Sequence, residues 1–209
     1  MAELFDQLEF VEDPLFETII NDLLQQNYSV IDNFFTEDEV VLLRNSLLVK
    51  YQEDSFKKAA IGSKFDEQIV SAVRGDFVLW MEEGRANPTE RLFFDKINSM
   101  VNYLNKTCFL GILHKEFHYA VYPKGTYYKR HLDTFQNDDR RKLSLVCYLN
   151  DLDWKEENGG ELVIYAKSPI VLHPLPGRIV IFESQVLEHE VKPVLASERY
   201  SITGWLKTR

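Results

Sequence analysis

The sequence has few cysteines and no long apolar run. Two of its 209 residues are cysteines, Cys108 and Cys147, and one possible pair cannot build a disulfide framework. No apolar stretch approaches the roughly 20 residues that cross a bilayer. Residues 1–6 lack the basic start and apolar core of a signal peptide. We therefore expect a cytoplasmic protein in a reducing compartment, with no membrane partner.

Positive charge is also scarce. Lysine and arginine number 24 against 33 aspartate and glutamate residues, which gives a formal net charge of −9. Affinity for phosphate backbones comes mainly from lysine and arginine, so the composition argues against a nucleic-acid partner. Hydrophobic residues, by contrast, make up 45% of the chain and aromatic residues 13%, which is typical of a packed globular protein. The length suits one domain, which we expect to span residues 1–209.

The N-terminal half has the spacing and start signals of helices. Apolar residues recur at helical spacing over residues 14–26. A capping-box pattern at Thr36 precedes a helix to about residue 51, and Asn87-Pro88 begins a helix to about residue 105. Residues 28–32 and 77–80 are strand-like, and we expect an irregular or mobile segment with a hairpin over residues 53–83. Residues 1–110 are therefore assigned to helical support and a mobile loop.

From about residue 115 the apolar pattern changes to period two, which predicts strands. Several short strands separated by turns favour a β-sandwich or barrel. Because the predicted helices all lie upstream, we expect them to pack outside one sheet. The fold class is thus mostly β with flanking helices, and its β core occupies residues 115–207. The predicted strands are residues 117–122, 143–149, 161–165, 178–182 and 200–206.

A histidine and an aspartate at alternate positions give the first chemical signal. On an extended chain, His131 and Asp133 face the same way and can converge on one ion. These residues alone fit a solvated loop at least as well. His189, after a predicted strand, supplies a third donor. Two histidines and one carboxylate form the facial triad of non-heme Fe(II) oxygenases, which leaves coordination positions open.

Arg199 begins the last predicted strand, where alternation places it on one face with Ser201, Thr203 and Trp205. An inward-facing arginine in a small β-structure is costly unless it meets an anion. Its planar guanidinium binds a carboxylate in a bidentate manner, which suits the distal carboxylate of 2-oxoglutarate. The alternative is an arginine on the surface or on an edge strand.

Several stretches between residues 122 and 207, in a fixed order, carry a family resemblance. They are Tyr122-Pro123, Tyr128 before His131-Leu132-Asp133, Cys147-Tyr148-Leu149-Asn150, Asp153-Trp154, Gly159-Gly160-Glu161-Leu162, His189-Glu190-Val191-Lys192-Pro193 and Arg199-Tyr200-Ser201-Ile202-Thr203. They resemble the Fe(II)/2-oxoglutarate-dependent prolyl hydroxylases, specifically the hypoxia-inducible-factor prolyl hydroxylases and their bacterial relatives. Upstream, Val73-Arg74-Gly75-Asp76 with Trp80 resembles the segment that closes over substrate in that group.

The resemblance implies a double-stranded β-helix, a jelly roll of the cupin-like kind, with iron between its sheets. It implies Fe(II) as the metal, 2-oxoglutarate as cosubstrate and O2 as oxidant, and it makes ascorbate a candidate reductant. Carried over residue by residue, it assigns the iron to His131, Asp133 and His189 and the distal carboxylate of 2-oxoglutarate to Arg199. The residues that it places around the cosubstrate and metal are Tyr122, Tyr128, Tyr148, Thr203 and Trp205. The spacing from His189 to Arg199 is one residue longer than in the hypoxia-sensing group, which predicts a small bulge.

We therefore predict a prolyl 4-hydroxylase that acts on a protein or peptide and releases succinate and CO2. Two alternatives remain open. The first is an oxygenase of the same type that hydroxylates a free amino acid or small metabolite, and the second is a catalytically silent β-helix module that binds proteins. Retention of the triad together with Arg199 argues against the silent module. The sequence does not indicate an oligomeric state.

Overall fold

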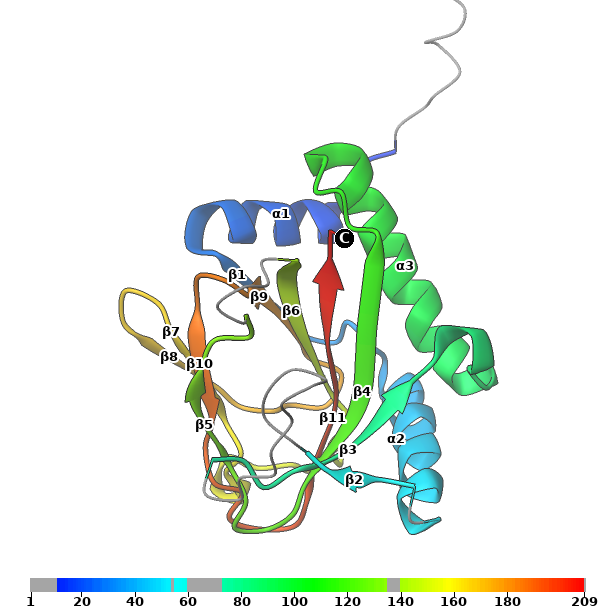
Figure 1. The fold of residues 1–209 in the computed structure, drawn as a ribbon, viewed down its shortest axis with the longest axis vertical. Coiled ribbons are helices and arrows are strands. Elements are labelled where there is room, and N and C mark those ends of the chain that lie inside the picture. The colour runs from blue at the N-terminus through cyan, green and yellow to red at the C-terminus, as the bar shows by residue number, and fades with distance from the viewer. Residues whose placement is uncertain (1–10, 54, 60–72, 135–139, 209) are drawn as a thin grey trace, which may run out of the picture.

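Two antiparallel sheets lie against each other, and three helices cover the outer side of the larger sheet (Figure 1). This computed structural model describes residues 11–53, 55–59, 73–134 and 140–208. The N-terminal residues used above to judge a signal peptide lie outside the described residues, as do residues 60–72 of the predicted irregular segment. The described parts confirm a mostly β fold with flanking helices, as the sequence predicts.

Helices α2 and α3 begin where the sequence places their caps, and α1 begins at a cap that the structure reveals. Helix α1 (Pro14–Gln26) is capped by the Asp13 side chain, which accepts hydrogen bonds from two backbone N–H groups of the first turn. Capping boxes begin α2 (Glu37–Gln52) at Thr36 and α3 (Pro88–Cys108) at Asn87. Short 3-10 turns, η1 (Glu83–Arg85) and η2 (Glu156–Asn158), join neighbouring elements.

The larger sheet has seven strands in the order β1-β9-β6-β11-β4-β3-β2. Strands from the N-terminal part of the chain extend it at both edges, so this part supplies sheet as well as helices. The strands are β1 (Tyr28–Ile31), β2 (Lys57–Lys58), β3 (Phe77–Met81), β4 (His114–Tyr122), β6 (Arg141–Tyr148), β9 (Ile179–Glu183) and β11 (Arg199–Lys207).

The smaller sheet has four strands in the order β5-β10-β7-β8. Of these, the sequence predicts β7 alone. In the other three, polar residues or a length of four residues hide the period-two pattern. The strands are β5 (Tyr128–His131), β7 (Leu162–Tyr165), β8 (Pro169–Leu172) and β10 (Glu188–Val191).

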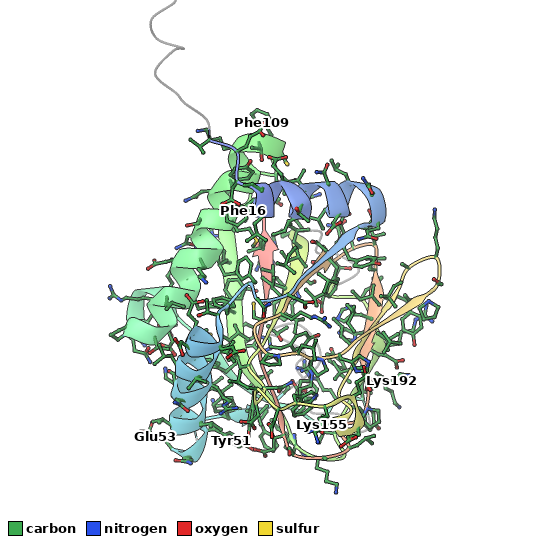
Figure 2. The ribbon with its side chains drawn as sticks, turned by 180° about the vertical axis from the view of Figure 1, so that it is seen from behind. Phe16, Tyr51, Glu53, Phe109, Lys155 and Lys192 are labelled. Atoms are coloured by element: carbon green, nitrogen blue, oxygen red, sulfur yellow. The ribbon has the colours of Figure 1, made fainter. Side chains whose placement is uncertain are left out.

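Alternation along the central strands divides the interior into two cores. On β4 and β6, one set of side chains, which includes Tyr119 and Leu145, packs against the helices. At α1, the ring of Phe16 lies 5.3 Å from that of Tyr103 in α3, so the helices also pack on each other (Figure 2). The opposite face of β4 and β6 packs against the smaller sheet, and this second core contains Tyr122 and Tyr148. The space between the sheets is where the predicted site residues gather.

Candidate active site

The three predicted metal ligands come together at the β5–β10 pair of the smaller sheet. His131 ends β5 and lies opposite His189 of β10 in the antiparallel register. Asp133 follows two residues after His131, so its carboxylate reaches both rings. Its Oδ1 lies 3.5 Å from His131 Nε2 and its Oδ2 lies 3.6 Å from His189 Nε2. One ligand atom from each residue fits within 4.8 Å, which is the spacing that a single ion requires.

Backbone carbonyls fix the orientation of both imidazoles. The Nδ1 atom of His131 lies 2.7 Å from the carbonyl oxygen of Lys129, and that of His189 lies 3.4 Å from the carbonyl oxygen of Leu187. A carbonyl can only accept, so each Nδ1 donates to its carbonyl and each Nε2 faces Asp133. Metal-binding histidines are commonly held in this way.

Burial and charge set the protonation states that metal binding needs. Burial lowers the pKa of His189 to about 4, against an opposing effect of the Asp133 charge. For Asp133, burial opposes ionisation, but His189, His131 and the Ser144 hydroxyl together hold its pKa well below the usual range. At neutral pH, therefore, the site offers neutral His189 and an ionised carboxylate, which are the ligand forms of these groups.

Tyr128 connects the site to the segment before β3. Its ring stacks on His131 with centroids 3.7 Å apart, and the guanidinium carbon of Arg74 lies 4.3 Å from the centroid of the Tyr128 ring. Asp76 holds Arg74 through two hydrogen bonds, and Arg74 forms a β-bridge with Tyr128. The segment that resembles a substrate-closing element therefore lies beside the candidate metal centre. Whether it moves stays a prediction.

Arg199 is buried between two tyrosines. It is 1% exposed, and its guanidinium carbon lies 4.9 Å from the ring centroid of Tyr122 and 5.0 Å from that of Tyr148. Its Nη1 donates to Ser201 Oγ at 3.3 Å, whereas its Nε and the Tyr148 hydroxyl have no hydrogen-bond partner. Within the described ranges, no carboxylate pairs with Arg199. Arg199 therefore points inward, and the alternative of a surface arginine is wrong.

The extra residue between His189 and Arg199 is not absorbed by a bulge in β10, because β10 pairs with β7 residue for residue from Glu188 to Val191. The register shift between β10 and β5 places an extra residue on β5, since His189 and Val191 lie opposite His131 and Tyr128. By contrast, β11 pairs with β4 without interruption, and Arg199 lies opposite Tyr122. The turn between β10 and β11 includes Ser197 in the left-handed region, with φ of 61°. The inward orientation of Arg199 is thus fixed by regular sheet pairing.

Thr203 and Trp205 lie farther along the same face of β11. Thr203 Oγ1 is 3.4 Å from Ser201 Oγ, which continues the polar row that begins at Arg199. Trp205 packs beside His118, 5.6 Å between centroids, and under the Arg141 guanidinium at 3.5 Å. Arg141 Nη1 in turn donates to the backbone oxygen of Asp133 at 2.8 Å. Trp205 therefore reaches the candidate metal centre through Arg141.

The arrangement fits both an iron(II) ion and a dicarboxylate. Two imidazoles and one carboxylate match the donor set of non-heme iron and leave coordination positions for other molecules. A buried guanidinium without an acidic partner, beside an unpartnered tyrosine hydroxyl, is suited to an anionic group. Burial raises the pKa of Tyr148 despite the nearby Arg199, so its hydroxyl stays protonated and can donate.

Fold and site together define an iron- and 2-oxoglutarate-dependent oxygenase. A family model described as the 2OG-Fe(II) oxygenase superfamily matches residues 117–207. A prolyl-4-hydroxylase from Pseudomonas putida is 31% identical in sequence with a TM-score of 0.83, and the match covers 93% of this chain and 99% of that one. The chain belongs to the 2OG-Fe(II) oxygenase superfamily, in its prolyl-hydroxylase-like group. The predicted family, fold and enzyme class are thereby confirmed.

Two further relatives point to the same group. A prolyl hydroxylase from Trichoplax adhaerens, solved with a hypoxia-inducible-factor peptide fragment, is 26% identical with a TM-score of 0.82, and the match covers 93% of this chain and 89% of that one. A PKHD-type hydroxylase of Synechococcus sp. is 37% identical over 87 residues, which span 40% of this chain and 38% of that protein. Among the described residues, no helix is long and apolar enough to cross a membrane.

The sequence did not indicate two residues that contact the site, Ser144 and Ser184. Ser144 Oγ donates to Asp133 Oδ2 at 2.7 Å, and Ser184 Oγ lies 2.8 Å from Ser144 Oγ. Ser144 lies within an apolar strand, and Ser184 follows one. A lone serine there has no sequence signature, and the single usable signal is that alternation places Ser144 on the same face of β6 as Tyr148.

Proposed function

We propose that this chain is an iron(II)- and 2-oxoglutarate-dependent prolyl 4-hydroxylase that modifies proline in a protein or peptide. One observation carries the proposal: a His-Asp-His metal site shares the space between the sheets with a buried arginine that lacks an acidic partner. A protein that only bound iron would need the His-Asp-His site, and a protein that only bound an anion would need the buried arginine. An oxygenase that consumes a dicarboxylate needs both.

The bound iron and 2-oxoglutarate would supply oxidative decarboxylation to succinate and CO2, coupled to insertion of one oxygen atom into a substrate C–H bond. His131, Asp133 and His189 would hold the iron. Arg199 would pair with the distal carboxylate of 2-oxoglutarate, and the Tyr148 hydroxyl would donate to the same group. Tyr122, also beside Arg199, would line the cosubstrate pocket, with Thr203 near the same carboxylate. Tyr128 and Trp205 would shape the cavity near the metal.

The choice of proline in a polypeptide rests on the relatives. The two structural relatives described above are called prolyl hydroxylases, and one of them was solved with a peptide fragment. An epimerase and a carbocyclase from nogalamycin biosynthesis share 11–12% identity with this chain, which shows the fold alone. The exposed Trp80, half of whose surface is open beside Trp205, offers an apolar contact for a chain lying over the site.

The test supplies the purified protein with Fe(II), 2-oxoglutarate, O2 and a library of proline-containing peptides. We expect succinate in equal amount to a product that is 16 Da heavier, with the added oxygen on proline, and no product from His131→Ala. Succinate coupled to hydroxylation of a free amino acid or metabolite, without a peptide product, would favour the first alternative. If the iron-loaded protein made no succinate with any substrate, the remaining interpretation would be the catalytically silent binding module.

We also propose that ascorbate keeps the iron reduced and that the protein works in the cytoplasm as a single domain. The proposal of a reducing compartment is supported by the two cysteines, both of which are free thiols. For ascorbate the support is the family resemblance. Dependence of sustained turnover on ascorbate, compared with a non-reducing analogue, would test it.

A further inference from the structure

Two buried serines form a row that ends on the candidate iron ligand Asp133. Ser144 of β6 is 1% exposed and Ser184, just after β9, is 0% exposed. Backbone pairing in the larger sheet sets Ser144 opposite Phe182, and just beyond β9 the Ser184 N–H donates to Lys142 O at 3.0 Å. The row is therefore held by rigid backbone on both sides.

The hydrogen bonds give the row a direction. The Ser144 hydroxyl has a single hydrogen, and it donates this hydrogen to Asp133 Oδ2. Ser144 has then no hydrogen left for its second neighbour. The 2.8 Å contact with Ser184 is consequently a hydrogen bond that Ser184 donates and Ser144 accepts. A hydroxyl that accepts one hydrogen bond is polarised into a stronger donor for the next.

We propose that Ser144 is a positioning residue that holds Asp133 as a one-oxygen iron ligand, and that Ser184 acts through Ser144. The hydrogen bond engages Oδ2 and fixes the plane of the carboxylate, which favours Oδ1 as the metal-binding atom. A carboxylate that bound through both oxygens would occupy a position that cosubstrate or oxygen needs. The inference rests on the proposed iron-dependent function and assigns roles to two residues that the function itself does not require.

The test measures metal binding without turnover, using Co(II) in place of Fe(II). We expect Ser144→Ala to weaken Co(II) affinity by about 10- to 100-fold, the usual effect of removing a partner of a metal ligand. It should also change the visible absorption of bound Co(II), because freeing Oδ2 alters the coordination number. Ser144→Thr keeps the hydroxyl and should restore both the affinity and the spectrum.

Ser29→Ala is the matched control. Ser29 is also fully buried and donates to a carboxylate, Asp22 Oδ2, at the same distance of 2.7 Å, but in α1 and β1. It should lose a comparable hydrogen bond and leave Co(II) affinity unchanged. Equal Co(II) affinity and spectra for Ser144→Ala and wild type, or an equal effect of Ser29→Ala, would overturn the inference.

A double-variant comparison separates the two serines. Because Ser184 acts through Ser144, Ser184→Ala should weaken Co(II) binding by a few-fold, and the Ser144→Ala/Ser184→Ala pair should be no weaker than Ser144→Ala alone. If the losses of Co(II) affinity in the two single variants added fully in the double variant, Ser184 would not act through Ser144. If wild type bound no Co(II) and His131→Ala behaved identically, the proposed function would fail instead, which keeps the two failures distinguishable.

Discussion

At the scale of single residues, the burial of Arg199 lowers the stability of the fold but prepares the protein to bind an anion. A buried guanidinium without a carboxylate partner among the described residues costs folding free energy, and the two flanking tyrosine rings offset part of that cost. The same guanidinium is then ready to bind a dianion without displacing an internal partner. Function and stability should therefore separate at this position.

Arg199→Met tests that separation. We expect binding of 2-oxoglutarate to weaken by at least about 10-fold, because a charge-assisted hydrogen bond contributes about 1.5–3 kcal/mol. Without cosubstrate, the free energy of unfolding should be at least that of wild type, since an apolar side chain replaces a buried charge. Titration calorimetry and urea unfolding measure the two quantities. A variant that binds 2-oxoglutarate normally would refute the assignment.

His118 makes a pH-dependent contribution at the same scale. Burial, aided by the Arg74 charge, lowers its pKa from 6.5 to about 4, so the folded state binds fewer protons than the unfolded state between these values. Stability from this group is therefore complete above pH 6.5 and is lost as the pH falls toward 4. The histidine packs against the rings of Trp80 and Trp205.

His118→Phe keeps a ring at this position and removes the titration. Between pH 7 and pH 4.5, the metal-free variant should lose about 2 to 3 kcal/mol less unfolding free energy than wild type. Urea unfolding at the two pH values measures the difference. The same loss in both proteins would show that His118 is protonated in the folded state at pH 4.5.

At the scale of elements, the turn before β7 shapes the anion site. Gly160 has a φ of +74°, and an added Cβ would lie 2.8 Å from Arg199 Cδ. A side chain here must therefore displace the arginine as well as strain the backbone. The turn thus bears on cosubstrate binding although it supplies no ligand.

Gly160→Ala should weaken 2-oxoglutarate binding several-fold and destabilise the fold by about 1–2 kcal/mol. Gly111→Ala is the matched control, because its φ is +65° and nothing lies within 4 Å of an added Cβ. It should reduce stability to a similar degree and leave 2-oxoglutarate affinity intact. Equal affinities for the two variants would contradict a role for the turn.

Elements that the sequence predicts well are those with a strong apolar period. Helix α1 and strands β4, β6, β9 and β11 match their predicted ranges to within a few residues. Strands β5 and β10, whose sequences are YKRH and EHEV, carry two of the proposed metal ligands and almost no apolar signal. They pair because neighbouring strands hold them, which is tertiary context that a local pattern does not contain.

The site residues divide in the same way, into those that the sequence reveals and those that depend on tertiary contacts. The donors and Arg199 could be found from spacing and from family resemblance, because their chemistry requires rare residue types in order. Ser144 and Ser184 could not, since serine is common and their roles depend on contacts between β6 and the end of β9. The stacking of Arg74 on Tyr128 likewise depends on a bridge between distant segments.

At the scale of the whole molecule, the candidate metal centre lies where the two sheets are linked. His131 and His189 belong to the smaller sheet, whereas Asp133 accepts a hydrogen bond from Ser144 of the larger sheet. A bound ion should therefore stabilise the folded protein as a unit. At 100 times its dissociation constant it would add about 2.7 kcal/mol to the free energy of unfolding.

Urea unfolding with and without Mn(II) measures this stabilisation in the absence of turnover. His131→Ala should abolish the Mn(II)-dependent increase. The increase should also fade as the pH drops toward 4, because protons compete for the histidine ligands. An undiminished increase in His131→Ala would mean that Mn(II) binds elsewhere.

The alternation along β11 has a consequence for how this protein tolerates change. Arg199, Ser201, Thr203 and Trp205 face the reaction space, whereas Ile202 and Leu206 face the helices. Substitutions at odd-numbered positions should thus alter catalysis, and those at even-numbered positions should alter abundance. In a deep mutational scan, positions along the nine-residue β11 would therefore alternate. Substitutions at one set would reduce activity, and substitutions at the other set would reduce the amount of folded protein.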